Sequence, residues 1–423
     1  MRTLIKHGLF FIEEKNHFEI SDLLIENGRI VKIAPYIDDK RASTIEINQS
    51  KCIIIPGLID LHCHLREPGQ EQKETIKTGT MAAAKGGYTR VVAMGNTTPS
   101  MSSSILYQQT LEKIKQDALI PVIQAGTITK NLEGKELSEV FKSNLSSVYS
   151  DDGKGIQDKQ VMTEAIRLAK KNKVLLILHE EDRDFDDYRS ESVMLKRDLE
   201  LAIQESYSIH FTHLSSQESV NTLTTFTNDS KHKPCFTADT TPHHLFFSNY
   251  DTIPDDTSFK VNPPLLSVID QKVLVEAVRK KIIQFIATDH APHTKQEKNQ
   301  SYELAPFGIS GFETAFPACY TVLCKYLQTL HKVSKRKLIP LFTSNPAKLL
   351  GIFKDEGSIA VGKKANLTFI DIKNEKKVVE SDLISKGKNT PFIGKHLFGW
   401  PILTMLEGEI VYEDSNSRLY KKS

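Results

Sequence analysis

The hydrophobic and polar positions of this chain change their period along its length. From residue 1 to about residue 54 the apolar positions come in short alternating runs, broken by a turn signal at residues 26–29, which is typical of small antiparallel strands. Residues 365–372 and 405–413 show the same pattern near the other end. We therefore expect residues 1–54 and 356–423 to form one composite β domain.

Between these ends, continuous apolar runs alternate with amphipathic stretches. The apolar runs cover residues 53–59, 90–94, 121–125, 174–178, 209–211 and 285–287, and the stretches with helical period cover residues 73–85, 104–117, 158–172, 191–205, 218–228 and 271–281. This alternation favours βα units around a parallel sheet. Because the chain lacks the Gly-rich turns of nucleotide-binding sheets, an α/β barrel of the (β/α)8 type over residues 55–355 is favoured, with the polar segment 294–304 as a candidate lid.

Composition and charge narrow the class of protein. The chain has 423 residues with 55 Lys and Arg against 53 Asp and Glu, so its balance of +2 indicates neither a nucleic-acid partner nor an anionic membrane. Its apolar runs are shorter than the ~18 residues that a membrane span needs, and early charges interrupt any secretory signal. The five cysteines form neither a disulfide framework nor a zinc cluster, so we expect a cytoplasmic protein with reduced thiols.

Residues able to bind a metal ion follow directly after the predicted strands. They are Asp60, His62, His64, Asp151, Asp152, His179, His213, Asp289 and His290. In a barrel, the carboxyl ends of the strands face one common site, so we expect these side chains to converge. His62 and His64 point the same way on a strand, whereas Cys63 between them points elsewhere. Imidazoles and carboxylates favour a zinc-like divalent ion, and two such ions ~3.5–4 Å apart would need a bridging carboxylate.

The roles of four histidines are less clear. His243 and His244 stay open, since Thr241-Pro-His-His also fits the start of a helix. His210 and His290 are interpreted as packing residues or as residues that support the ligands.

Longer motifs resemble dihydroorotases of the amidohydrolase superfamily, in their class I branch. They are PGLIDLHCHLREPG at 56–69, YSDDGKGIQ at 149–157, VNPPL at 261–265, IATDHAPH at 286–293, APFGISGFETA at 305–315, NTPFIG at 389–394 and WPILTM at 400–405. The resemblance implies a (β/α)8 barrel with a small β-sandwich domain made from both chain ends. It also implies two Zn²⁺ ions per subunit.

The resemblance further implies a ligand set and a reaction. His62, His64 and Asp289 would hold one ion and His179 and His213 the other, with Asp152 bridging and Asp151 as the alternative bridge. The implied activity is the reversible cyclisation of N-carbamoyl-L-aspartate to L-dihydroorotate in de novo pyrimidine (UMP) biosynthesis. A hydroxide bridging the two ions, formed because they lower the pKa of water from 15.7 toward ~7, would attack the ring amide. Asp289 would be the general acid and base.

The substrate carries a carboxylate, which the guanidinium fork of Arg66 can grip in two places. The resemblance adds Asn96 and His293 to this carboxylate site, and Asn262 with the main chain of Phe307 and Gly308 to a site for the ring.

The sequence also departs from that family. Gly95 stands where proline is usual, which would loosen the loop that presents Asn96. Leu266 stands where a basic residue is common, and the segment between His179 and His213 is short for that branch. Two alternatives stay open: another cyclic amidase of the hydantoinase or allantoinase type, and a non-catalytic subunit that binds aspartate transcarbamoylase. As partners we expect a second copy of the chain, in a homodimer, and possibly that transcarbamoylase.

Overall fold

The computed structural model describes residues 2–47, 51–185, 187, 189–228, 236–326, 333–415 and 420–422. Its strands are β1 Arg2–Ile12, β2 His17–Glu26, β3 Arg29–Ala34, β4 Ser43–Ile47, β5 Cys52–Pro56, β6 Leu58–Cys63, β7 Tyr88–Ala93, β8 Val122–Gln124, β9 Val148–Tyr149, β10 Leu175–Leu178, β11 Ile209–Phe211, β12 Phe236–Thr240, β13 Phe285–Ile286, β14 Leu367–Asp371, β15 Lys376–Lys377, β16 His396–Leu397, β17 Trp400–Leu406, β18 Glu409–Glu413 and β19 Tyr420–Lys422.

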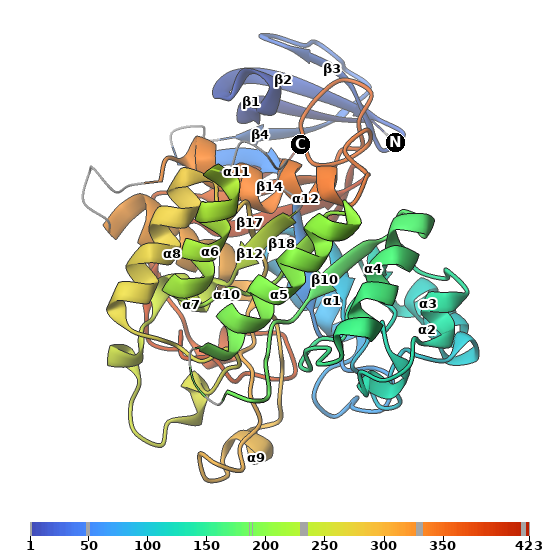
Figure 1. Cartoon of the computed structure of the whole chain (residues 1–423). Coiled ribbons are helices and arrows are strands. Elements are labelled where there is room, and N and C mark those ends of the chain that lie inside the picture. The colour runs from blue at the N-terminus through green and yellow to red at the C-terminus, as the bar shows by residue number, and fades with distance from the viewer. Residues whose placement is uncertain are drawn as a thin grey trace.

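Its helices alternate with these strands in the middle of the chain (Figure 1). They are α1 Ile76–Lys85, α2 Ser104–Asp117, α3 Glu139–Lys142, α4 Lys159–Asn172, α5 Arg189–Glu205, α6 Gln217–Asn228, α7 Pro242–Phe246, α8 Val268–Lys280, α9 Lys295–Lys298, α10 Phe312–Cys319, α11 Lys335–Phe342 and α12 Ser344–Leu349. A π-helical stretch covers Tyr320–Tyr326, and short 3₁₀ turns cover Glu13–Lys15, Lys130–Leu132, Asn249–Asp251, Thr257–Phe259 and Glu380–Asp382. Within the described residues, none of the helices is both long and apolar enough to cross a membrane.

The six helices predicted from the helical period are confirmed, with small differences at their ends. For example, α1 begins at Ile76 and not at residue 73, because Thr75 caps it. The Thr75 hydroxyl accepts a hydrogen bond from the Thr78 amide, and the Thr78 hydroxyl accepts one from the Thr75 amide, both at 3.1 Å. The helix α10 was missed because every one of its residues is buried, so it has no polar face and no amphipathic period.

Two sheets of parallel strands form the middle of the molecule, in the orders β6-β7-β8 and β13-β12-β11-β10-β9. Two isolated parallel bridges, Gly126 with Tyr149 and Cys63 with His290, join the ends of these sheets. The helices α1, α2, α4, α5, α6 and α8 connect successive strands and cover them, and together they bury one large apolar core. The expected α/β class is confirmed.

A nine-stranded sheet combines both ends of the chain, in the order β18-β17-β14-β5-β1-β2-β3, with β4 beside β1 and β19 beside β4. β5 pairs antiparallel with β14, so residues 52–56 lie against residues 367–371, as the similar patterns of the two ends led us to expect. This sheet has its own apolar core, which includes Phe10, Ile54 and Phe369. Its strands β1 to β4 lie at one end of the molecule, and α9 lies at the other (Figure 1).

One expectation for this sheet is wrong. β4 and β5 both run parallel to β1, whereas the first 54 residues were predicted to form antiparallel strands. The alternating pattern reports which side chains a strand buries, and it carries no information on the direction of the neighbouring strand. Residues 1, 48–50, 416–419 and 423 of the predicted composite domain lie outside the described residues.

Candidate metal centre

The candidate ligands come from the carboxyl ends of five parallel strands. His62 is in β6 and His64 follows it, Asp152 follows β9, His179 follows β10, His213 follows β11 and Asp289 follows β13. These six residues, the ligand cluster below, are all buried. The structure thus brings together the six residues of the ligand set that the resemblance implied, whereas Asp60, Asp151 and His290 lie outside the cluster.

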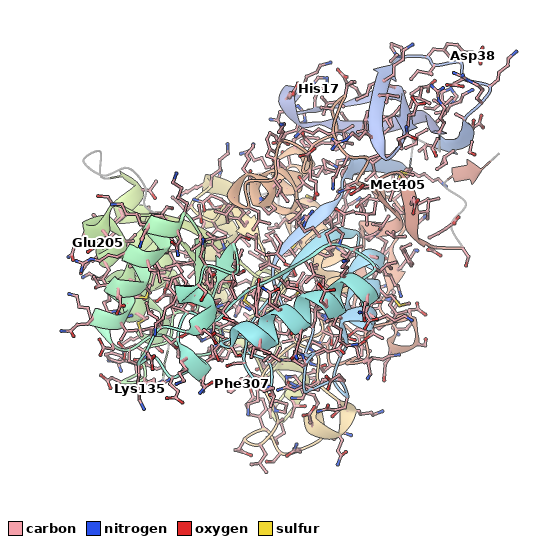
Figure 2. The ribbon with its side chains drawn as sticks, turned by 90° about the vertical axis from the view of Figure 1, so that its right-hand side faces the viewer. His17, Asp38, Lys135, Glu205, Phe307 and Met405 are labelled. Atoms are coloured by element: carbon pink, nitrogen blue, oxygen red, sulfur yellow. The ribbon has the colours of Figure 1, made fainter. Side chains whose placement is uncertain are left out.

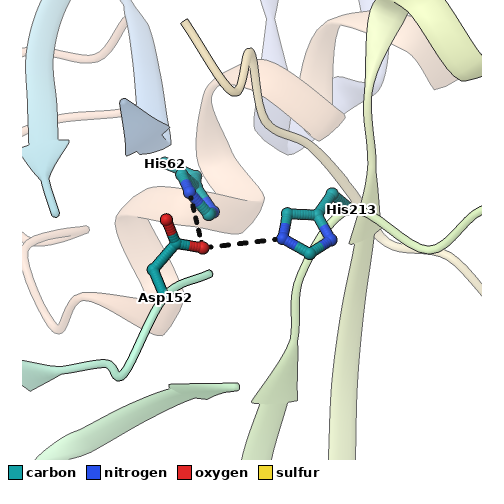
Figure 3. Close-up of side chains that lie close together, drawn as sticks. All are labelled: His62, Asp152 and His213. Carbon is teal, nitrogen blue, oxygen red and sulfur yellow. Dashed lines mark ion pairs between the residues drawn. The ribbon is translucent and has the colours of Figure 1, made fainter. Parts of the chain in front are cut away.

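The carboxylate of Asp152 lies at the centre of the ligand cluster. Its Oδ1 atom is 3.2 Å from His62 Nε2, 3.6 Å from His213 Nε2 and 3.7 Å from His179 Nδ1. Its Oδ2 atom is 3.4 Å from His64 Nε2. Figure 3 shows Asp152 between His62 and His213, with each ring nitrogen directed at the same carboxylate oxygen. One carboxylate therefore faces four imidazoles through both of its oxygen atoms.

Asp289 closes the other side of the cluster. Its Oδ1 atom is 3.2 Å from His64 Nε2 and 3.6 Å from His62 Nε2. Among the described residues, two groups of three could each hold a metal ion, because the ligand atoms within each group lie within 4.8 Å of one another. The first group is His62, Asp152 and His213, and the second is His62, His64 and Asp289. His179 Nδ1 extends the first group, at 2.9 Å from His213 Nε2.

Asp151, the alternative bridge, faces away from the histidines. Its Oδ1 atom accepts hydrogen bonds from the amides of Ile128 at 2.7 Å and Thr129 at 3.0 Å, and its Oδ2 atom contacts the Thr129 hydroxyl. Burial raises the pKa of Asp151 to about 6 in spite of these hydrogen bonds. Asp151 thus anchors the loop after β8, and Asp152 is the residue of this pair whose carboxylate faces the histidines.

The hydrogen bonds around the imidazoles leave their inward nitrogens able to bind a cation. Thr212 Oγ1 donates to Asp239 Oδ2 at 3.1 Å, so it accepts from His62 Nδ1 at 2.8 Å, and Nε2 is the nitrogen of His62 that faces the cluster. His62 Nε2 is buried and has no hydrogen-bond partner among the described residues. The Cys63 thiol donates to the Val92 carbonyl, away from the cluster. This nitrogen and oxygen donor set fits zinc or a similar divalent ion.

The negative charges of the buried carboxylates in the cluster also favour a bound cation. Burial by itself lowers the pKa of His62, but the carboxylates of Asp152 and Asp289 outweigh it and raise that pKa to about 10. For Asp152, burial raises the pKa, and the facing histidines hold it well below its usual range. A divalent cation between these groups would take the place of the proton on His62.

A buried hydrogen-bond network behind the cluster was not predicted from the sequence. Asp239 in β12 accepts from the Thr212 hydroxyl and, through Oδ1, from the His213 amide at 2.7 Å. Its Oδ2 atom lies 2.8 Å from His210 Nε2, so His210 supports the ligands as expected. Asp239 is the one charged residue of β12, which has the sequence FTADT, and that is the signal that could have identified it.

The main chain at the strand ends is strained where it aims these side chains. Arg66, His213 and Asp289 have φ values of 61°, 41° and 44°, in the left-handed region that L-residues rarely adopt. Each such conformation costs about 1–3 kcal/mol and persists where the surrounding structure imposes it, which is common at functional sites.

The remaining candidates take structural positions. The Asp60 carboxylate accepts from the amide and hydroxyl of Thr288 at 2.8 and 2.6 Å, which fastens β6 to the residue before Asp289. His290 stacks on Phe312 with ring centroids 4.1 Å apart, so it is a packing residue. His243 and His244 are buried in the first turn of α7, which Thr241 caps. Their helix-start interpretation is confirmed.

The expected substrate-binding residues line a cavity beside the cluster. Arg66, Asn96, Asn262, Phe307 and Gly308 line this cavity of about 170 Å³ together with members of the ligand cluster. His293 lies behind them, with Nε2 3.2 Å from Arg66 Nη2 and 2.7 Å from the Phe307 carbonyl oxygen. Burial, followed by the charge of Arg66, lowers the pKa of His293 to about 2, so its ring is neutral and donates to Phe307.

Asn96 holds two ligands in place. Its Oδ1 atom lies 2.9 Å from His64 Nδ1, and its Nδ2 atom donates to Asp152 Oδ2 at 3.0 Å. The preceding Gly95 is packed, because a Cβ atom there would lie 2.9 Å from the Ala125 carbonyl oxygen. The loop that presents Asn96 is therefore tightly fitted at this glycine and not loosened by it.

Comparison with known proteins defines the class of protein. The profile of the amidohydrolase family matches residues 53–411, and the chain belongs to this family. Curated relatives named dihydroorotase include that of Bacillus cytotoxicus, 38% identical over 439 residues, and that of Bacillus cereus, 37% identical over 439 residues. Each of these alignments covers 99% of this chain and 100% of the relative.

Solved structures with similar folds are known at lower sequence identity. A D-hydantoinase is 21% identical with a TM-score of 0.86, covering 98% of this chain and 96% of its own. The L-hydantoinase of Arthrobacter aurescens is 20% identical with a TM-score of 0.86, covering 97% and 96%. At these identities the likeness establishes the amidohydrolase fold.

Proposed function

We propose that the protein is a dihydroorotase, which interconverts N-carbamoyl-L-aspartate and L-dihydroorotate. The observation that carries this proposal is one small cavity that both Arg66 and members of the ligand cluster line. A cyclic amide with a carboxylate substituent needs both of these elements. The full-length similarity to proteins named dihydroorotase supports the same assignment.

The proposal includes two Zn²⁺ ions, held by His62, His64 and Asp289 on one side and by His179 and His213 on the other, with Asp152 between them. It also includes a closed (β/α)8 barrel over residues 55–355, supported by the two bridges that join the parallel sheets. The composite sheet would be the core of a β-sandwich domain from residues 1–54 and 356–423, supported by the pairing of β5 with β14.

When bound, the ions would lower the pKa of water and polarise the amide carbonyl that water attacks. Asp289 would carry the proton between the attacking water and the leaving ring nitrogen. Burial raises the pKa of its carboxyl, but His64 and His62 hold that pKa below its usual range, so the group is ionised and can accept this proton. In the reverse direction Asp289 would take the proton from the ureido nitrogen as the ring closes.

Arg66 would hold the substrate carboxylate. Its Nε atom donates to the Pro292 carbonyl at 3.1 Å, which fixes the guanidinium at the cavity wall. Asn96 would keep its contacts with His64 and Asp152 and would also form part of the site for the substrate carboxylate. Asn262 and the main chain of Phe307 and Gly308 would border the ring.

The deciding experiment is the rate of L-dihydroorotate ring opening by the zinc-reconstituted protein, measured beside Asp289→Asn. We expect activity in the wild type and a loss of about 10²–10⁴-fold in the variant, as for a lost acid–base group. Asp255→Asn is the matched control, since Asp255 is exposed and has a φ of 64° that Asn also tolerates.

The same assay separates the alternatives. Hydrolysis of hydantoin without hydrolysis of dihydroorotate would assign the protein to the hydantoinase type, whose fold it shares. No turnover of either compound by protein that holds two zinc ions would favour a non-catalytic subunit.

A further inference from the structure

The segment after the last ligand borders the substrate cavity. Residues 294–308, the rim segment below, contain the short helix α9 and end with Phe307 and Gly308, which line the cavity. Figure 2 shows Phe307 in the lower part of the molecule, far from His17 of β2 and Asp38, which lie near its top. Part of this segment, residues 294–304, was a candidate lid on the basis of its polar sequence.

Two buried lysines hold the rim segment. Lys298 Nζ, from within the segment, donates to the carbonyls of Pro306 at 2.9 Å and Gly308 at 3.3 Å. Lys260 Nζ, from outside it, donates to the carbonyls of Tyr302 at 2.5 Å and Glu303 at 2.9 Å. The exposed fractions of Lys298 and Lys260 are 7% and 6%. The two ammonium groups thus hold the main chain of the rim segment at residues 302–303 and at residues 306–308.

Main-chain and ring contacts add to this attachment. The Gly308 amide donates to the Lys260 carbonyl at 2.9 Å, and the Thr257 hydroxyl donates to the Lys298 carbonyl at 2.5 Å. The Lys260 ammonium also lies 4.7 Å from the centre of the Phe307 ring, within the range of a cation–π contact. Phe307 is therefore positioned through its ring by Lys260 and through its carbonyl by His293.

Burying an ammonium group is costly, so two such groups at one turn need a reason. Burial lowers the pKa of Lys298 to about 8, which reflects this cost. An apolar side chain would fill the same space more cheaply, but it would leave the carbonyls of Pro306 and Gly308 without these donors. What the buried lysines provide in return is a main chain that is held in one conformation beside the cavity.

We propose that Lys260 and Lys298 are positioning residues that hold the rim segment as a fixed wall of the substrate cavity. This inference rests on the proposed function, because it assumes that the substrate ring contacts Phe307 and Gly308. The wall is preformed, so substrate binding does not have to order it. Neither lysine contacts the ligand cluster, which includes Asp289. Loss of either lysine should therefore weaken substrate binding and leave the rate of the chemical step unchanged.

The test compares Lys298→Met and Lys260→Met with the wild type in two measurements. Each substitution should raise the KM for L-dihydroorotate about tenfold, as for a lost charge-assisted hydrogen bond, with kcat within about twofold and an unchanged zinc content. Amide hydrogen exchange of residues 299–308 should become faster in both variants, because the amides of Leu304, Ala305 and Gly308 are hydrogen-bonded in the held segment.

Two further variants complete the design. Lys295→Met is the matched control, because Lys295 is exposed on the same helix α9, and it should change neither measurement. Lys298→Arg keeps the charge and the donors, so it should restore most of the affinity and slow the exchange again.

Hydrogen exchange needs no activity, so it separates this inference from the proposed function. Faster exchange in a protein that does not act on dihydroorotate would leave the two lysines as the anchor of the segment and overturn the assigned substrate. Unchanged exchange in both methionine variants would overturn the inference. A fall in kcat with an unchanged KM, or faster exchange with an unchanged KM, would also overturn it, because the segment would then not act through substrate binding.

Discussion

The two sides of the cavity are built in different ways. On one side, the ligand cluster consists of side chains that project from the ends of strands in the core. On the other side, the rim segment presents main-chain groups of an irregular segment, which lysines hold in place. The chemistry of the ligand cluster depends on which side chains are present. The shape of the rim segment depends on the conformation of its main chain.

This difference predicts a division of labour. Changes to the ligand cluster or to the network behind it should alter metal content and turnover together. Changes to the rim segment or to Arg66 should alter substrate affinity and leave the metal in place. Four measurements test how far this separation holds.

The largest effect is expected at the bridging position. Asp152→Asn removes the carboxylate that faces four imidazoles, so the protein should bind less than its full complement of zinc and lose activity to the level of the uncatalysed reaction. Zinc content by elemental analysis and ring-opening rates check this result. Asp151→Asn is the matched control, and folded Asp151→Asn protein should keep its zinc. The reverse pattern would make Asp151 the bridge.

The next effect comes from the network behind the cluster. Asp239→Asn takes away the negative charge that orients Thr212 and the His213 amide. Loss of such an outer partner typically weakens metal binding about 10–100-fold, and we expect this in a competition titration with a zinc chelator. The KM at saturating zinc should change little. A large rise of KM with unchanged zinc affinity would contradict the proposed separation.

The placement of ligand residue types at strand ends predicted that the members of the ligand cluster converge, but it also included Asp60, Asp151 and His290, and only the resemblance singled out the six. His62, His179 and Asp289 needed no knowledge of loops. Neither Lys260 nor Lys298 stood out, because their partners are carbonyls, and every residue has one. Strand pairing also depends on main-chain groups that every residue has. The pattern therefore predicted the strands of the composite sheet but not the parallel direction of β4 and β5 relative to β1.

A smaller effect is expected at the substrate carboxylate. Arg66→Lys keeps the charge but loses the planar fork, so it should raise KM about tenfold, which corresponds to roughly 1.4 kcal/mol. Zinc content should stay the same, because Arg66 contacts Pro292 and His293 and not the ligands. Steady-state kinetics with both the cyclic and the open substrate check this. Loss of zinc in Arg66→Lys would show that the two sides of the cavity are coupled.

The smallest effect is expected where the two sides meet, at Glu181. Its Oε1 atom accepts from Asn262 Nδ2 at 3.1 Å, and its Oε2 atom lies 3.5 Å from His179 Nε2. Glu181 is partly exposed, so Glu181→Ala should cost only about 0.5–1 kcal/mol, a change of roughly two- to fivefold, divided between zinc affinity and KM. Glu181→Gln keeps an acceptor for Asn262 and should restore KM but not zinc affinity. If both variants changed KM alone, Glu181 would belong to the substrate side, and the separation of the two sides would be complete.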